Sequence, residues 1–201
     1  MSNVRIVTIE RQYATGGKRI SEIVAENLGV PFYNEKILEL ASEKIGLPAD
    51  YLRDVEETTS GSLLFSLAMA ATVNATGVTL MSLTEQLYAA EEEIIREIVK
   101  EGPCVIVGRC AGHILRERDD CLNVFIYANK DARVKRATEV YNVARQDVES
   151  MIRRTDKLRA NFYNTNAQKK WGDRDNYHLC LDSGFLGMDK CAQIIADAAR
   201  F

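Results

Sequence analysis

Residues 4–19 read VRIVTIERQYATGGKR and contain, in order, a strand pattern, a glycine turn and the beginning of a helix. The β-branched run from Val4 to Ile9 is typical of a buried strand. Gly16 and Gly17 mark the turn. Helical spacing follows in the apolar residues Ile20, Ile23, Val24 and Leu28. The sequence therefore predicts a strand, a loop and a helix at the start of the chain.

The loop of this unit has the composition of a phosphate-binding loop. Glycines let successive backbone N–H groups point at phosphate oxygens, and the positive end of the following helix adds to the attraction. The residues predicted to hold donor phosphates are Tyr13, Ala14, Thr15, Gly16, Gly17, Lys18 and Arg19, with the Lys18 ammonium at the β- and γ-phosphate oxygens. Compared with the pattern G-x-x-x-x-G-K-[ST], Gln12 replaces the first glycine and Arg19 the hydroxyl residue. A tight turn followed by an exposed lysine is the alternative interpretation.

Further strands and helices alternate along the chain. Apolar runs predict strands at residues 30–33, 104–107, 122–128 and 177–181. Helical patterns begin near residue 34 and cover residues 83–101, 129–141, 144–169 and 188–199. Alternating strands and helices predict an α/β fold of three layers, α/β/α, with a five-stranded parallel sheet. Ligands of such sheets bind at the carboxyl ends of the strands.

The composition is that of one globular domain. The chain has 201 residues, of which 46% are apolar and 27% charged, enough for a single buried core. A formal net charge of −3 gives no broad attraction for nucleic acid, so we expect no nucleic-acid partner and a local cluster of Lys and Arg at any phosphate site. Five widely spaced cysteines without a C-x-x-C pair indicate reduced thiols in a cytoplasmic protein. Charges soon after the first residues predict no secretory signal.

Residues 58–84 carry no charged side chain and are long enough to cross a bilayer. Scattered hydroxyl residues and two glycines, Gly61 and Gly77, argue against a membrane span. We expect either a buried helix pair or a self-association surface, because an uncharged surface must be covered. A homodimer through residues 60–83 is one form of this expectation.

The two histidines, His113 and His178, have no Cys, His or carboxylate at ligand spacing. We interpret both as structural histidines rather than as metal ligands or catalytic bases. Trp171 could pack against the lid or stack on a base, and packing is expected, because a lone aromatic residue usually belongs to the core.

Three later segments occur in the order found in cytidylate kinases. They are Val105-Ile106-Val107-Gly108-Arg109, the stretch Arg153-Arg154-Thr155-Asp156-Lys157-Leu158-Arg159, and the residues from Tyr163 through Trp171-Gly172-Asp173 to Asn176-Tyr177-His178-Leu179-Cys180-Leu181-Asp182. With the phosphate loop, they make nearly the whole chain resemble the cytidylate kinase-like family of P-loop nucleoside monophosphate kinases. The resemblance implies one domain, residues 1–201, with a helical acceptor-binding insertion at 35–100 and an Arg-rich lid at 144–172.

The resemblance also implies an activity, the transfer of the γ-phosphoryl group of ATP to a nucleoside monophosphate. CMP or dCMP is the implied acceptor and Mg²⁺ the implied metal. Arg109 is assigned to the acceptor phosphate, for which a bidentate guanidinium is suited.

The lid residues are Arg153, Arg154, Lys157 and Arg159. With Lys18, Arg153 and Arg159 are the implied catalytic residues, which stabilise the charge in transit. A solvated basic helix face, paired with Asp147 and Glu149, is the alternative interpretation of the lid cluster.

Two aspartates of the family pattern are missing. Cytidylate kinases typically carry Asp-Gly-Arg-Asp where this chain has Val107-Gly108-Arg109-Cys110. The first aspartate normally helps to hold Mg²⁺, as does the hydroxyl residue replaced by Arg19, so the metal ligands stay unassigned. Either Glu10, Thr15 or Asp182 supplies a substitute through water, or the phosphates hold the metal with little help from the protein.

The missing aspartates leave two further functions open. One is a regulatory protein that binds nucleotides at a degenerate kinase site, which the lost metal partners favour. The other is a kinase for another small acceptor, because the second aspartate, replaced by Cys110, helps to recognise the acceptor.

Overall fold

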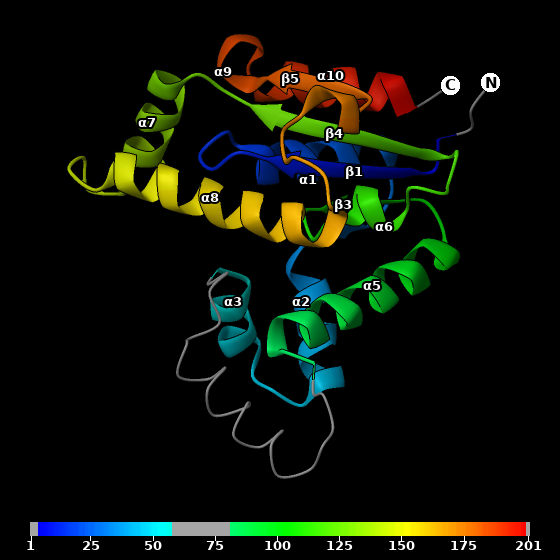
Figure 1. Ribbon diagram of the computed structural model, residues 1–201. Coiled ribbons are helices and arrows are strands. Elements are labelled where there is room, and N and C mark those ends of the chain that lie inside the picture. Colours follow the sequence, from blue (N-terminus) through cyan, green and yellow to red (C-terminus); the bar gives the residue numbers. More distant parts are fainter. Residues whose placement is uncertain (1–3, 58–80, 200–201) are drawn as a thin grey trace.

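The computed structural model describes residues 4–57 and 81–199 (Figure 1). Its five-stranded sheet has the order β2-β3-β1-β4-β5, and every pair of neighbouring strands is parallel. The strands are β1 (Ile6–Arg11), β2 (Phe32–Tyr33), β3 (Cys104–Val107), β4 (Cys121–Tyr127) and β5 (Leu179–Asp182). The predicted α/β fold with five parallel strands is confirmed.

Helices cover both faces of this sheet (Figure 1). One face carries α1 (Gly17–Leu28) and α10 (Met188–Ala199), and the other carries α5 (Leu83–Glu101) and α6 (Ala111–Ile114). All four residues of β3 are buried between these layers, as expected for a parallel sheet covered on both sides.

A helical arm projects from the sheet beside α5 (Figure 1). It consists of α2 (Glu35–Ile45) and α3 (Ala49–Glu57). These helices and α5 share an apolar cluster that includes Leu38, Ala41, Leu52 and Leu87. The predictions made for residues 58–80, including the dimer surface, fall outside the described residues. No helix in the described part of the chain is long and apolar enough to cross a membrane.

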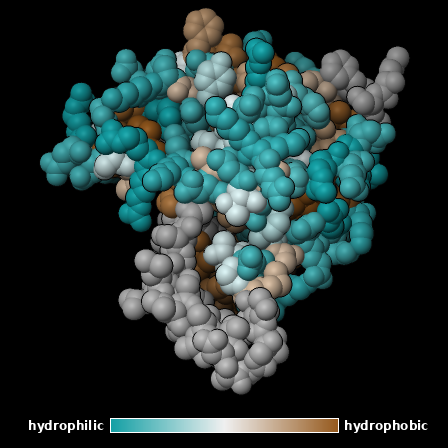
Figure 2. Space-filling view, viewed as in Figure 1, coloured by the Kyte–Doolittle hydropathy of each residue, from teal (hydrophilic) through white to brown (hydrophobic). Residues whose placement is uncertain are grey.

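The carboxyl-terminal third supplies α7 (Lys130–Glu139), α8 (Val148–Ala167), a 3-10 turn η1 (Arg174–Asn176) and α9 (Ser183–Leu186). As predicted, Asn129 caps α7, since its Oδ1 accepts a hydrogen bond from the Ala132 N–H at 2.9 Å. Figure 2 shows that hydrophilic residues cover most of the face on which α7 and α8 lie. Strand β5 begins two residues later than predicted, because the Tyr177 N–H donates to the Arg174 carbonyl of η1 at 3.1 Å instead of joining the sheet.

Candidate active site

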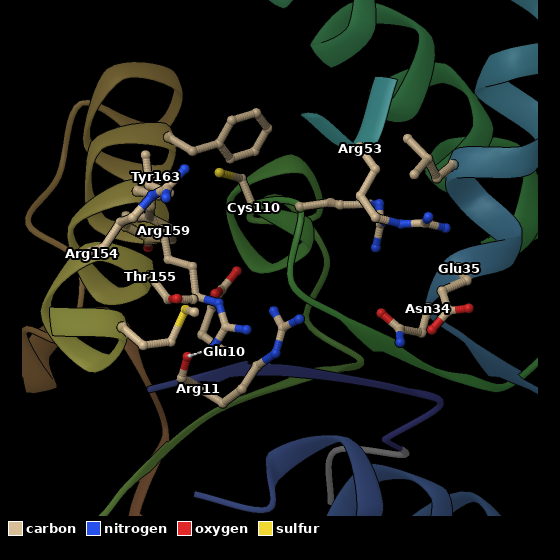
Figure 3. A pocket seen from close by; sticks show the side chains of 15 residues that line it. Glu10, Arg11, Asn34, Glu35, Arg53, Cys110, Arg154, Thr155, Arg159 and Tyr163 are labelled. Carbon is tan, nitrogen blue, oxygen red and sulfur yellow. Dashed lines mark hydrogen bonds between the residues drawn. The ribbon is translucent and has the colours of Figure 1, made fainter. Parts of the chain in front are cut away.

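A cavity of about 390 Å³ opens between the carboxyl ends of the strands, the helical arm and α8 (Figure 3). We call it the first cavity. Its cationic lining consists of Arg11, Arg53, Arg109, Arg154 and Arg159. Two carboxylates, Glu10 and Glu35, also line it. Five guanidinium groups against two carboxylates suit an anionic ligand, and the cavity lies where a parallel sheet is expected to bind one.

Arg109 is held by a buried ion pair. Its Nε donates to Glu91 Oε1 at 2.8 Å, and the two side chains are 8% and 0% exposed. Arg109 and Cys110 both have left-handed backbones, with φ of 55° and 54°. Non-glycine residues in this region are uncommon and cluster at functional sites. The strained turn after β3 and the Glu91 carboxylate together fix the guanidinium.

Helix α8 presents only part of the predicted lid to this cavity. Figure 3 shows Arg154 and Arg159 on α8, on the side that faces Arg11. Arg159 Nη1 donates to the Arg11 carbonyl at 3.0 Å. Arg153, by contrast, is 71% exposed, pairs with Glu149 at 3.4 Å and does not line the cavity. The exposed Lys157 is also absent from the lining.

The phosphate loop adjoins the first cavity without lining it. None of residues 13–19 lines the cavity, but the Arg11 side chain does, and a Cβ added at Gly17 would lie 2.7 Å from Arg11 Cβ. Gly16 precedes α1 with a left-handed backbone, φ 78°. A Cβ there would lie 2.7 Å from Met188 Sδ and 3.2 Å from Arg136 Cζ, so only glycine fits both the backbone and the space.

Lys18 links the phosphate loop to the helical arm. Its Nζ lies 2.8 Å from Glu35 Oε1 at the start of α2, and both side chains are about half exposed. This contact holds the pKa of the Glu35 carboxyl below its usual range. Arg19 instead pairs along α1 with Glu22 and Glu26, each at 3.3 Å. The two adjacent cations of the loop therefore point to different parts of the molecule.

A latch between α7, α8 and the phosphate loop was not anticipated from the sequence. The Tyr13 N–H donates to Asp156 Oδ1 at 2.7 Å, and Arg133 Nε donates to the Tyr13 carbonyl at 2.7 Å. Arg133 and Asp156 also form an ion pair with each other. Both backbone polar groups of Tyr13 are thus satisfied by one ion pair, of the buried Arg133 and the partly buried Asp156, which fixes the loop.

Arg133 carries little sequence signal of its role. It occurs at helical spacing from Ala137, and these are the two buried residues of α7. Asp156 lies within the predicted lid, but its contact with Tyr13 spans 143 residues, and no local pattern encodes such a distance.

Glu10 is the candidate metal partner that lines the first cavity. Its Oε2 accepts a hydrogen bond from Trp171 Nε1 at 3.2 Å. Trp171 packs edge-on against Phe125 with ring centroids 5.2 Å apart, so the packing expected of it is confirmed. The other candidates are engaged elsewhere, Thr15 Oγ1 with the Gln12 carbonyl at 2.9 Å and Asp182 as the cap of α9.

The described residues suit Mg²⁺ that arrives with a nucleotide. Residues 4–57 and 81–199 contain no group of three His, Cys, Asp or Glu side chains able to hold a metal ion. Magnesium is commonly bound by one or two carboxylates together with substrate phosphates and water. Glu10 could provide such a carboxylate, and the phosphates would provide the remaining charge.

Cys110 makes one wall of the first cavity neutral. The side chain is buried, and burial raises the pKa of its thiol far above the ordinary value. Tyr163, on the facing helix, has its pKa raised to about 12 by burial. Neither group carries charge at neutral pH, so the position where cytidylate kinases have an aspartate offers no carboxylate to an acceptor.

The fold and the arginine-lined cavity at its strand ends are those of a P-loop kinase. The chain belongs to the cytidylate kinase-like family, whose model matches residues 6–184. This membership supports a kinase that acts on a nucleotide or another small molecule. A comparison with curated proteins finds no match.

Several solved structures are similar to this chain. An uncharacterized protein from Eubacterium ventriosum ATCC 27560 is 23% identical, with a TM-score of 0.72 and coverage of 96% of this chain and 97% of that one. The shikimate kinase from Bacteroides thetaiotaomicron is 12% identical, with a TM-score of 0.57 and 98% coverage of both chains. The shikimate kinase from Acinetobacter baumannii, in complex with shikimate, is 14% identical, with a TM-score of 0.55 and coverage of 98% and 93%. At these identities the likeness shows the fold alone.

Proposed function

We propose that this protein transfers the γ-phosphoryl group of ATP to a nucleoside monophosphate, with CMP or dCMP as the first candidate. The observation that carries this proposal is the convergence of Arg109, Arg154 and Arg159 on one cavity at the strand ends. Phosphoryl transfer is catalysed mainly by positioning and by neutralising charge on the phosphoryl oxygens. Three guanidinium groups around one space are suited to both tasks.

Each cation has a distinct role in this proposal. Arg109, fixed by Glu91, binds the acceptor phosphate, while Arg154 and Arg159 neutralise the charge in transit. Lys18 and its loop bind the donor phosphates, for which Lys18 must exchange the Glu35 carboxylate for phosphate oxygens. Because the acceptor already carries a phosphate, no general base is required.

Arg153 lies outside the first cavity, unlike Arg154 and Arg159. It is exposed and paired with Glu149, so it could join the transferred phosphoryl group only after α8 rotates. Arg136 beside Gly16 is a further candidate for the donor phosphates, because its guanidinium already lies at the loop.

The acceptor base would be recognised by the helical arm. Asn34, Glu35 and Arg53 line the first cavity on the side opposite α8 (Figure 3). An amide and a carboxylate can accept hydrogen bonds from an exocyclic amino group, as of cytosine, and a guanidinium can donate to a ring carbonyl. These side chains would replace the recognition that the missing aspartate provides.

A regulatory nucleotide-binding protein is the second candidate. The observation that favours it lies on the donor side, where residues 13–19 line no part of the first cavity and Met188 and Arg136 lie close over Gly16. A kinase for another small acceptor is the third, and the neutral Cys110 favours it.

The test is Mg²⁺-dependent release of ADP from ATP with a panel of nucleoside monophosphates, and with shikimate and gluconate as other acceptors. We expect turnover with a pyrimidine nucleotide, and a loss of about 100-fold or more in Lys18→Ala. The matched control Lys100→Ala removes the same exposed charge from the end of α5, where Lys100 pairs with Glu97, and should change turnover by no more than about twofold.

Each other outcome points to a different function. ATP binding without ADP release on any acceptor would indicate the regulatory protein. Turnover only with a hydroxyl acceptor would indicate the third candidate. Failure to bind ATP at all would contradict all three.

A further inference from the structure

A second cavity, of about 230 Å³, lies beside α6 and is separated from the first cavity by Tyr163. Its lining comes from α6 and the turn after it, from Asn123 in the first half of β4, and from the segment that connects α8 to β5. The first cavity is instead at the carboxyl ends of the strands. Tyr163 of α8 lines both cavities, so they share one wall.

The second cavity has a surplus of positive charge. Arg116, Arg118 and Lys169 line it together with the carboxylate of Asp175, and a second carboxylate, Asp120, pairs with Arg118, which leaves an excess of one positive charge. Arg118 is oriented by Asp120, with N–O distances of 2.8 and 2.6 Å. Lys169 makes no hydrogen bond or ion pair within the part of the chain that the structure describes, so its ammonium is available to a ligand.

Both histidines of the chain line this cavity. His178 Nδ1 accepts a hydrogen bond from the Asn123 N–H at 3.0 Å, so the neutral ring carries its proton on Nε2 and can donate there. Burial lowers the pKa of His113, and the charges of Arg116 and Lys169 lower it further, whereas Glu92 opposes them. His113, interpreted above as structural, thus lies beside the positive charges of Arg116 and Lys169, which would favour a bound anion.

We propose that the second cavity binds a small anion bearing a phosphate group, at a site distinct from that of the kinase substrates. Guanidinium and ammonium donors on one wall and a neutral imidazole N–H on another match the oxygens of a phosphate. The volume is below the roughly 300 Å³ at which pockets for drug-sized ligands begin, so the site suits inorganic phosphate or the phosphate end of a metabolite. This proposal does not depend on kinase activity.

The test uses imidazole NMR signals of the intact protein during titration with inorganic phosphate at constant ionic strength, set with chloride. With only two histidines in the chain, both signals report on the second cavity. We expect saturable shifts of both signals and a higher pKa of His113, because a bound anion offsets Arg116 and Lys169. A small phosphate monoester that is not a nucleotide, glycerol phosphate, forms a second arm, because a nucleotide would also enter the first cavity, and tighter binding of this ester would identify a metabolite as the source of the phosphate.

Matched variants locate the binding site. Lys169→Gln should weaken phosphate binding about tenfold, the effect of losing one charged contact. Lys190→Gln removes the same charge from α10, on the other face of the sheet, and should leave binding unchanged. Shifts that persist in Lys169→Gln but vanish in Arg154→Gln would place the phosphate in the first cavity and overturn the proposal. Shifts that do not saturate, or that chloride reproduces, would overturn it as well.

Discussion

The two cavities share Tyr163 and a surplus of positive charge, yet they hold their arginines differently. Arg109 in the first cavity is 8% exposed against a fully buried Glu91. Arg118 in the second is 34% exposed against Asp120 at 18%. A buried pair is strongly destabilising to break, whereas a pair near solvent contributes little. The first cavity is therefore built to fix the geometry of its charges, and the second only to supply charge.

The largest expected effect comes from breaking the buried pair. Glu91→Ala leaves the Arg109 charge buried without its carboxylate, and should lower the free energy of unfolding by about 3–5 kcal/mol. The control is Glu92→Ala, which removes a neighbouring carboxylate paired with Arg96 on the helix surface. It should change stability by less than about 1 kcal/mol in the same urea titration. Equal effects of the two substitutions would contradict the stabilising role assigned to the buried pair of Arg109 and Glu91.

The latch beside the first cavity should show the next largest effect. Asp156→Ala removes the acceptor of the Tyr13 N–H and the partner of Arg133, and should cost about 2–3 kcal/mol of stability. The KM for ATP should rise more than kcat falls, because the loop is no longer fixed. Lys157→Ala, at the exposed next residue, should stay within about 0.5 kcal/mol of the wild type. An unchanged KM for ATP in Asp156→Ala would show that the latch does not prepare the donor site.

Two adjacent arginines of α8, one inside the first cavity and one outside it, extend the comparison to catalysis. Arg154→Gln, inside the first cavity, should lower kcat/KM about 100-fold because it removes charge from the site of transfer. Arg153→Gln, on the exposed face, should change it by no more than about twofold. A larger effect at Arg153 would mean that α8 rotates when substrates bind.

The smallest effect belongs to the pair of the second cavity. The hydrogen bond from Arg118 holds the pKa of Asp120 below its usual range, so the pair stabilises the fold above the unfolded pKa of about 3.9. This contribution is lost as the pH falls through the lower pKa of the folded state. Unfolding of Asp120→Asn should therefore differ from that of the wild type by less than about 1 kcal/mol at neutral pH, and the difference should shrink in acid. A difference that grows in acid would contradict this assignment.

Most of the fold could be predicted because each strand is a short apolar run next to a helical pattern. The starts of β2 and β5 are exceptions, each two residues later than predicted, and before β5 the Asp173 side chain accepts the Asp175 N–H and sets the 3-10 turn η1. That contact depends on one side chain rather than on a hydrophobic period, so the apolar run at residues 177–181 extended the predicted strand too far.

The site was predictable only in part. The order of motifs pointed to Arg109 and Arg159, which lie together in the first cavity. It favoured Arg153 over Arg154 for catalysis, whereas Arg154 is the one that lines the first cavity, because adjacent helical residues point about 100° apart. The rotation of α8 depends on long-range packing, in which Ile152 and Tyr163 are buried against different parts of the molecule.

The central position of β1 has a consequence during synthesis. Ile6 is fully buried between Cys104 of β3 and Cys121 of β4, so an early segment of the chain waits for partners made much later. At typical rates of translation this wait is on the order of ten seconds. An apolar strand exposed for that long is prone to aggregate unless charged residues flank it. The apolar run of β1, residues 6–9, is preceded by Arg5 and followed by Glu10 and Arg11. Glu10 and Arg11, which line the first cavity, would therefore also keep the nascent chain soluble.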